Sequence, residues 1–142
     1  MAVPGLSEDD LALIKSALLL ECLQRIFQRD ARVLEQSGVL KSPEVYVDFI
    51  RHGESRASVV LAEIHDQFRQ RNIEIYRISQ DENGIRAEYR YRGFHGKMNI
   101  FWSALQQEVS KRMRAYLSGN GEASSASSSG RTIGQEATAL VE

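Results

Sequence analysis

The sequence predicts a mostly helical α+β domain followed by a disordered tail. Apolar residues recur at helical spacing from Leu11 to Phe68, whereas they alternate with polar residues between Ile73 and Arg92. From Ser118 onward, Ser, Gly and Ala dominate and large apolar residues are rare, a composition that does not repay the entropy of ordering. We therefore expect one globular domain over residues 1–117, the usual size of a domain, and a disordered tail over residues 118–142.

Composition and charge narrow the class of protein. The hydrophobic fraction of 42% and the charged fraction of 26% are typical of a globular protein. A single cysteine, Cys22, and the lack of a secretory leader pattern favour the cytoplasm. The longest apolar run, residues 17–23, contains Glu21 and is far shorter than the roughly 20 residues that span a bilayer, so no membrane contact is expected.

Positive charge is concentrated in the second half of the domain. Residues 1–66 contain 7 Lys and Arg against 11 Asp and Glu, whereas residues 67–117 contain 10 against 5. An asymmetry of this kind favours an anionic partner, although it is modest beside that of dedicated nucleic-acid-binding domains.

The first helix has a clear beginning and a clear end. Ser7 with Asp10 forms a capping-box pattern that predicts a start at Glu8, and Gly38 is typical of a helix C-cap. Apolar residues cover more than one face of this helix. Once one stripe is assigned to the domain core, a second set remains, which predicts a homodimer through Leu13, Ala17, Leu20 and Leu23.

A second helical segment begins at Ser42-Pro43, because serine caps helices and proline is tolerated at their first position. Its apolar register continues to Phe68 across Gly53. Glycine inside a helix costs about 1 kcal/mol relative to alanine, which predicts either a break or close packing near His52-Gly53. Whether this segment is one helix or two stays open at this point.

A β-hairpin follows, with Asn83-Gly84 as the expected type I′ turn. This turn places Tyr89 opposite Ile78 and Tyr91 opposite Tyr76. Residues 93–97 then read as a loop before a last helix, in which Phe101, Leu105, Val109, Met113 and Tyr116 have helical spacing.

The other face of the predicted hairpin is rich in arginine. The expected register places Arg77 opposite Arg90, an unfavourable pair that a protein tolerates when an anion bridges it. The alternative is a solvated face neutralised by Glu74, Asp81 and Glu88. The candidate anion-binding or nucleic-acid-binding residues, two of them from the second helical segment, are Arg56, Arg69, Arg77, Arg86, Arg90 and Arg92.

The order of elements resembles that of a winged helix-turn-helix, if the second segment breaks at Gly53-Glu54 and residues 55–72 form the recognition helix. This analogy supports a non-enzymatic binding or regulatory protein that contacts nucleic acid through the basic hairpin. The alternative is a protein-binding or structural module that contacts an acidic protein surface and oligomerises through its first helix.

A short motif suggests a third hypothesis. Arg51-His52-Gly53-Glu54-Ser55 resembles the phosphate-binding signature of the histidine phosphatase and phosphoglycerate mutase family, which implies that His52 takes a phosphoryl group held by Arg51. That family places the motif on the first strand of an α/β sheet with a second catalytic histidine far downstream, whereas a long helix precedes it here. We favour a helix interruption with polar edges, and we predict no enzyme, no cofactor and no metal site, because His52, His65, His95 and Cys22 lack the spacing of metal ligands.

Overall fold

The computed structural model describes residues 3–119, so the predicted disordered tail lies outside the described residues except for its first two positions. The elements in chain order are α1 (Glu8–Ser37), α2 (Pro43–Arg71), β1 (Ile73–Gln80), β2 (Gly84–Tyr91), β3 (Phe94–Phe101) and α3 (Trp102–Ser118). The mostly helical α+β class is confirmed.

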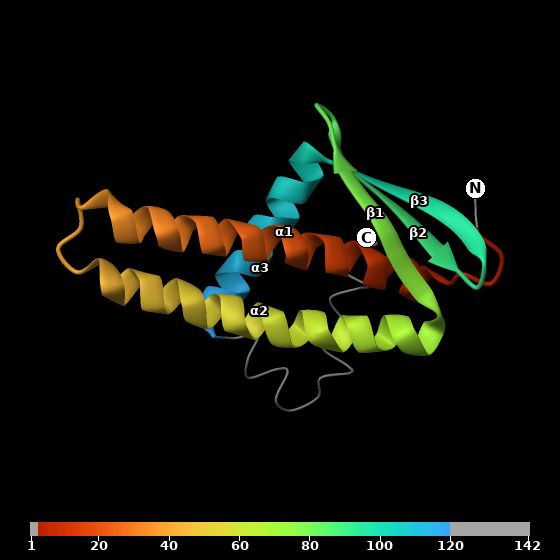
Figure 1. Ribbon diagram of the computed structural model, residues 1–142, viewed down its shortest axis with the longest axis horizontal. Coiled ribbons are helices and arrows are strands. Elements are labelled where there is room, and N and C mark those ends of the chain that lie inside the picture. The colour runs from red at the N-terminus through yellow and green to blue at the C-terminus, as the bar shows by residue number, and fades with distance from the viewer. Residues whose placement is uncertain (1–2, 120–142) are drawn as a thin grey trace.

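Two long helices form the body of the domain. Figure 1 shows α1 and α2 side by side and antiparallel, with α3 crossing them and the sheet lying at the end where α1 begins. The opposite end of the α1–α2 pair extends beyond both α3 and the sheet. None of the helices within residues 3–119 combines the length and the apolarity needed to cross a membrane.

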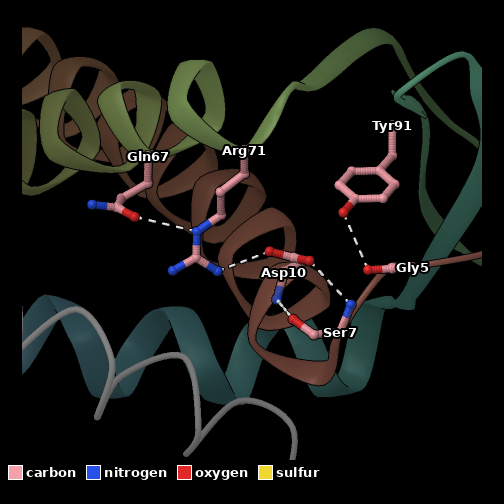
Figure 2. A network of polar contacts seen from close by, with 6 residues as sticks. All are labelled: Gly5, Ser7, Asp10, Gln67, Arg71 and Tyr91. Atoms are coloured by element: carbon pink, nitrogen blue, oxygen red, sulfur yellow. Dashed lines mark hydrogen bonds and ion pairs between the residues drawn. The ribbon is translucent and has the colours of Figure 1, made fainter.

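The predicted ends of α1 are confirmed. The Ser7 hydroxyl accepts a hydrogen bond from the Asp10 N–H at 3.1 Å, and the Ser7 N–H donates to Asp10 Oδ2 at 3.0 Å, which completes the capping box (Figure 2). Gly38 ends the helix in the left-handed conformation with φ 70°. Just before α1, the Gly5 carbonyl accepts a hydrogen bond from the Tyr91 hydroxyl at 3.1 Å, which attaches the N-terminal segment to the sheet.

Gly53 lies inside an uninterrupted α2, so close packing, not a break, explains this glycine. A Cβ at this position would lie 2.9 Å from Leu117 Cδ2 of α3 and 3.5 Å from the Phe27 ring of α1. The turn that a helix-turn-helix requires at Gly53-Glu54 is therefore absent, and the predicted winged-helix order of elements is wrong.

The surplus apolar residues of α1 are packed inside the single chain. The side chains of the predicted dimer interface are at most 3% exposed and belong to the one hydrophobic core: Leu13, Ala17, Leu20 and Leu23. The dimer interface predicted on these residues is therefore wrong, because α2, α3 and the sheet together surround the first half of α1 and bury them.

The sheet has three antiparallel strands in the order β1-β2-β3, so the loop predicted at residues 93–97 is wrong. The turn with two positive φ angles lies between β2 and β3, at Arg92 (49°) and Gly93 (86°). Neither Asn83 nor Gly84 has a positive φ. Instead, Asp81 Oδ1 accepts hydrogen bonds from the N–H groups of Asn83 (2.8 Å) and Gly84 (3.1 Å), and this carboxylate shapes the β1–β2 turn.

The turn is centred one residue earlier than predicted, because the Asp81 N–H donates to the Gly84 carbonyl at 3.0 Å, and this changes the pairing of β1 with β2. Arg77 lies opposite Glu88, and Ile78 lies opposite Ala87. A bulge between Ile75 and Arg77 then shifts the register, so that Tyr89 pairs with Ile75, Tyr91 with Ile73, and Arg90 with Glu74. The predicted Arg77–Arg90, Tyr89–Ile78 and Tyr91–Tyr76 pairs are therefore wrong.

Candidate functional site

An open groove lies on the side of α1 between the ends of β1 and β2 and the start of α3. Its volume is about 480 Å³, and its lining is Leu18, Glu21, Cys22, Arg25, Ile26, Arg29, Ile78, Gln80, Ile85 and Trp102. A second cavity of about 350 Å³ shares Cys22, Ile26 and Trp102 with the first and continues along α3 over Leu105, Gln106, Val109, Ser110 and Met113. We call the two cavities together the α1 groove.

Trp102 lines both parts of the α1 groove. Its indole Nε1 donates a hydrogen bond to the Asp81 carbonyl at 2.9 Å, and its backbone N–H donates to the Asn83 carbonyl at 3.1 Å. The β1–β2 turn therefore holds the first residue of α3 in place. Trp102 is 37% exposed, so part of this large aromatic residue is in contact with solvent.

The α1 groove is apolar in its floor and cationic at one end. Within residues 3–119, the side chains of Arg25 and Arg29 form no ion pair or hydrogen bond, and Glu21 is the one acidic residue of the lining. Burial raises the pKa of the Cys22 thiol, and nearby Arg25 offsets part of that rise. At neutral pH Cys22 is therefore a protonated, weakly polar part of the floor.

β1 is an edge strand, and the groove lies beneath its second half. In the described sheet β1 pairs with β2 alone, so its other edge has no strand partner. Ile78 and Gln80 point toward the helices and line the groove, and Ile78 is still 42% exposed. An open strand edge beside an apolar depression has the geometry of a peptide-binding site.

The predicted arginines lie elsewhere, and three of them share the sheet face that points away from the helices. Arg77 Nη1 is 3.6 Å from Glu88 Oε2, Arg90 Nη2 is 3.3 Å from Glu74 Oε1, and Arg86 Nε donates to Asn99 Oδ1 at 3.1 Å. Arg77 and Arg90 thus face acidic partners, and no bridging anion is needed to explain them.

β3 adds residues to this face that the sequence reasoning missed. His95 Nδ1 lies 2.9 Å from the Tyr76 hydroxyl, and the Arg90 guanidinium lies 5.2 Å from the centroid of the Tyr76 ring. Lys97 and Phe101 occupy alternate positions of β3 on the same side as His95. We call this surface the outer sheet face; its charged residues are Glu74, Arg77, Arg86, Glu88, Arg90 and Lys97. The signal for β3 was weak because Gly96 interrupts it and Gly93 directly precedes it.

The remaining predicted arginines are not part of the outer sheet face. Arg56 Nη1 donates to the Tyr116 carbonyl at 2.5 Å and so caps the C-terminal end of α3. Arg69 pairs with Asp66 within α2. Arg92 lies in the β2–β3 turn, with its guanidinium 5.2 Å from the centroid of the Tyr91 ring.

The phosphatase-like motif lies in the middle of α2. His52 is exposed on a helix, and Arg51 Nη2 is 3.6 Å from Glu35 Oε1 of α1. The strand that precedes this motif in the histidine phosphatases is absent here, because α2 begins at Pro43. Among residues 3–119, no group of three His, Cys, Asp or Glu side chains is close enough together to hold a metal ion.

A protein-family model described as YhjD protein matches residues 5–121, which include all six elements of the fold. The chain belongs to the YhjD family. A member of Bacillus subtilis (strain 168), described as "Uncharacterized protein YhjD", is 29% identical over 115 residues, which are 81% of this chain and 95% of that protein. No solved structure matches the chain significantly. The YhjD family match therefore includes the α1 groove and the outer sheet face and ends at residue 121.

Proposed function

We propose that this chain is a non-enzymatic protein-binding module that holds an extended segment of a partner protein in the α1 groove. The observation that carries the proposal is the position of Trp102 and Ile78. Each is more than one-third exposed, and together they line the 480 Å³ cavity of the α1 groove, beside an open strand edge. Apolar lining with a few polar groups is typical of binding sites.

The open edge of β1 gives the proposed mode of binding. An extended segment that pairs with this edge forms main-chain hydrogen bonds, which depend little on its sequence. Its side chains alternate between two sides, so every second one points down toward Cys22 and Ile26. Selectivity then comes from the shape of the floor and from Trp102.

The positive charge of the groove lining indicates that the partner segment contains an acidic residue. Arg25 and Arg29 have no ionic partner among residues 3–119, and they outnumber Glu21 in the lining. A segment that combines alternating apolar residues with a nearby Asp or Glu satisfies both the floor and these guanidinium groups.

The chain contains one tryptophan, so Trp102 is an intrinsic fluorescent reporter of the groove. Panning a phage-displayed random peptide library on the full chain should enrich peptides with alternating apolar residues and an acidic residue. Titration of an enriched synthetic peptide should shift the Trp102 emission. Ile78→Glu and Arg25→Glu should each weaken binding about tenfold or more.

Val59→Glu is the matched control, because Val59 is 56% exposed on α2 and does not line the groove. It should leave the affinity unchanged. Peptides that bind equally well to Ile78→Glu, or a library from which no peptide is enriched, would contradict the proposal.

A second candidate function, nucleic-acid binding, is supported by the outer sheet face. This face contains four cations and two acids, together with Tyr76, His95 and Phe101. Aromatic and cationic side chains on a sheet favour single-stranded nucleic acid, whose bases stack on the rings. A DNA-binding or RNA-binding regulator of this kind would use the sheet and not a recognition helix.

Salt dependence separates the two candidates. If an oligonucleotide binds the outer sheet face, its log affinity should fall linearly with log salt concentration. Replacing Arg86 and Lys97 with Gln should then reduce that slope by about two units, because these cations form no ion pair within residues 3–119. Peptide binding in the α1 groove should not respond to these two changes.

A further inference from the structure

Exposed apolar side chains gather where α1 ends and α2 begins. Figure 1 shows that this end of the helix pair extends beyond α3 and beyond the sheet, so none of the elements in residues 3–119 covers it. The residues, each more than half exposed, are Val33, Val39, Val45, Tyr46 and Phe49, and we call this surface the helical tip.

The start of α2 exposes three large apolar side chains within five residues, whereas the solvent-facing side of a helix is ordinarily polar. Val45, Tyr46 and Phe49 are adjacent on the helix surface, because residues four apart lie one turn above each other. Val39, in the loop between the helices, is 83% exposed. Contiguous apolar patches on a domain surface mark contacts with another molecule.

The charges around the helical tip favour a partner of mixed sign. Glu35 and Arg51 neutralise each other across the two helices at 3.6 Å. The other ionic groups of the tip are two cations, Arg32 and Lys41, and two anions, Glu44 and Asp48; none of the four forms an ion pair within residues 3–119. A nucleic acid or an anionic membrane favours a net positive surface, which this tip does not have.

A second copy of the chain matches this pattern. In a two-fold symmetric contact each chain presents the same patch, so Lys41 of one chain meets Glu44 and Asp48 of the other, and the reverse contact forms at the same time. Two helical hairpins that meet in this way form a four-helix bundle, which buries the apolar residues of both.

We infer that the helical tip is a homodimer interface. It replaces the interface expected on Leu13, Ala17, Leu20 and Leu23, whose side chains are buried within one chain. It is also separate from the α1 groove, because the two share no residue. An experiment can therefore contradict the proposed dimer interface without contradicting the proposed peptide binding, and the reverse also holds.

Sedimentation of the full-length chain over a concentration series tests the interface. We expect a reversible monomer–dimer equilibrium that Phe49→Glu weakens about tenfold or more. Val59→Glu also replaces an exposed apolar residue of α2 with glutamate, at nearly the same exposure, 56% against 53%, and should leave the equilibrium unchanged. A chain that is monomeric at all concentrations, or a dimer that Phe49→Glu does not weaken, would overturn the inference.

A charge exchange tests the two-fold arrangement itself. Two variants are needed: one has Lys41→Glu, and the other has both Glu44→Lys and Asp48→Lys. Each variant alone should dimerise weakly, because like charges then meet across the interface. An equimolar mixture should form heterodimers, which mass differences detect, because opposite charges meet again. Loss of self-association without heterodimers in the mixture would exclude this pairing.

Discussion

Asp10 Oδ1 accepts a hydrogen bond from Arg71 Nη1 at 2.8 Å, and this ion pair joins the first turn of α1 to the last turn of α2 (Figure 2). The Asp10 side chain is 8% exposed, whereas that of Arg71 is 37% exposed. Gln67 Oε1 accepts a further hydrogen bond from Arg71 Nε at 3.2 Å. The carboxylate that caps one helix therefore also fixes the position of the other.

Replacing Asp10 with Ala should lower the free energy of unfolding by about 2–3 kcal/mol. The change removes the capping box and leaves Arg71 without its carboxylate. Arg71→Ala should cost only about 1 kcal/mol, because part of this guanidinium is already solvated. Urea denaturation of both variants and of the double variant measures the coupling; purely additive costs would show that the two side chains do not cooperate.

Acid should destabilise the fold through the same residue. Burial by itself raises the pKa of Asp10, but the Ser7 hydrogen bonds and the Arg71 guanidinium outweigh it, and the net pKa is lowered. A lowered folded-state pKa gives stability that is complete above the unfolded-state pKa, and that is lost as the pH falls through the folded-state value. The unfolding free energy should therefore decrease as the pH falls below about 5.

Asp10→Asn should flatten this pH dependence only in part. The pKa of Asp81 is also lowered, because its carboxylate accepts the N–H groups of Asn83 and Gly84. The check is urea denaturation at several pH values for both proteins. An identical acid slope in the two proteins would mean that Asp10 has an ordinary pKa in the folded state.

The elements that sequence reasoning predicted correctly depend on short-range signals. The Ser7–Asp10 box, the Gly38 cap and the proline start of α2 each involve residues a few positions apart, so their physics is visible in the sequence. The prediction of the β1–β2 turn was wrong because two short-range signals disagree there. Asn83-Gly84 favours a type I′ turn, whereas hydrogen bonds to the Asp81 carboxylate favour the turn that the structure has, and residue preference alone does not decide between them.

The candidate site was beyond sequence reasoning because its residues come from distant segments. Cys22, Ile78 and Trp102 become neighbours only when the sheet and α3 pack on α1. β3 was missed because Gly96 breaks the strand pattern. That glycine pairs with Tyr89, whose ring would lie 2.5 Å from a Cβ at this position, so the glycine makes room for a buried aromatic ring.

Alanine should cost more folding stability at Gly84, the first residue of β2, than at Gly93, in the β2–β3 turn. A Cβ at Gly84 would lie 2.0 Å from the Ile100 carbonyl oxygen, so Gly84→Ala should cost about 3 kcal/mol through strand displacement. Gly93 has a φ of 86° with open space around it, so Gly93→Ala should cost only about 1–2 kcal/mol of backbone strain. Equal midpoints in urea would show that backbone approach at Gly84 is not tight.

The arginines of the outer sheet face should make small contributions to stability. Arg77→Gln and Arg90→Gln each remove an exposed ion pair, with Glu88 and Glu74 respectively, so each should lower the unfolding free energy by less than about 1 kcal/mol. A gain in stability in either variant would instead indicate the repulsive Arg77–Arg90 register. Thermal denaturation at low and high salt measures both variants, and the loss should shrink as salt increases.

The single cysteine should report on the α1 groove through its reaction rate with a thiol reagent. Burial raises the pKa of the Cys22 thiol, so its thiolate fraction at about pH 8 is smaller than that of a free cysteine. Ellman's reagent should therefore react more slowly with the folded chain than with the chain unfolded in urea, and the folded rate should continue to rise at higher pH.

Arg25 lowers the pKa of the Cys22 thiol, so Arg25→Gln should slow the reaction further, whereas Arg32→Gln, a change on α1 outside the groove lining, should not. A folded chain that reacts as fast as the unfolded one would show that the groove leaves the thiol fully solvated. A peptide held over Cys22 should protect it, and this protection should disappear with Ile78→Glu.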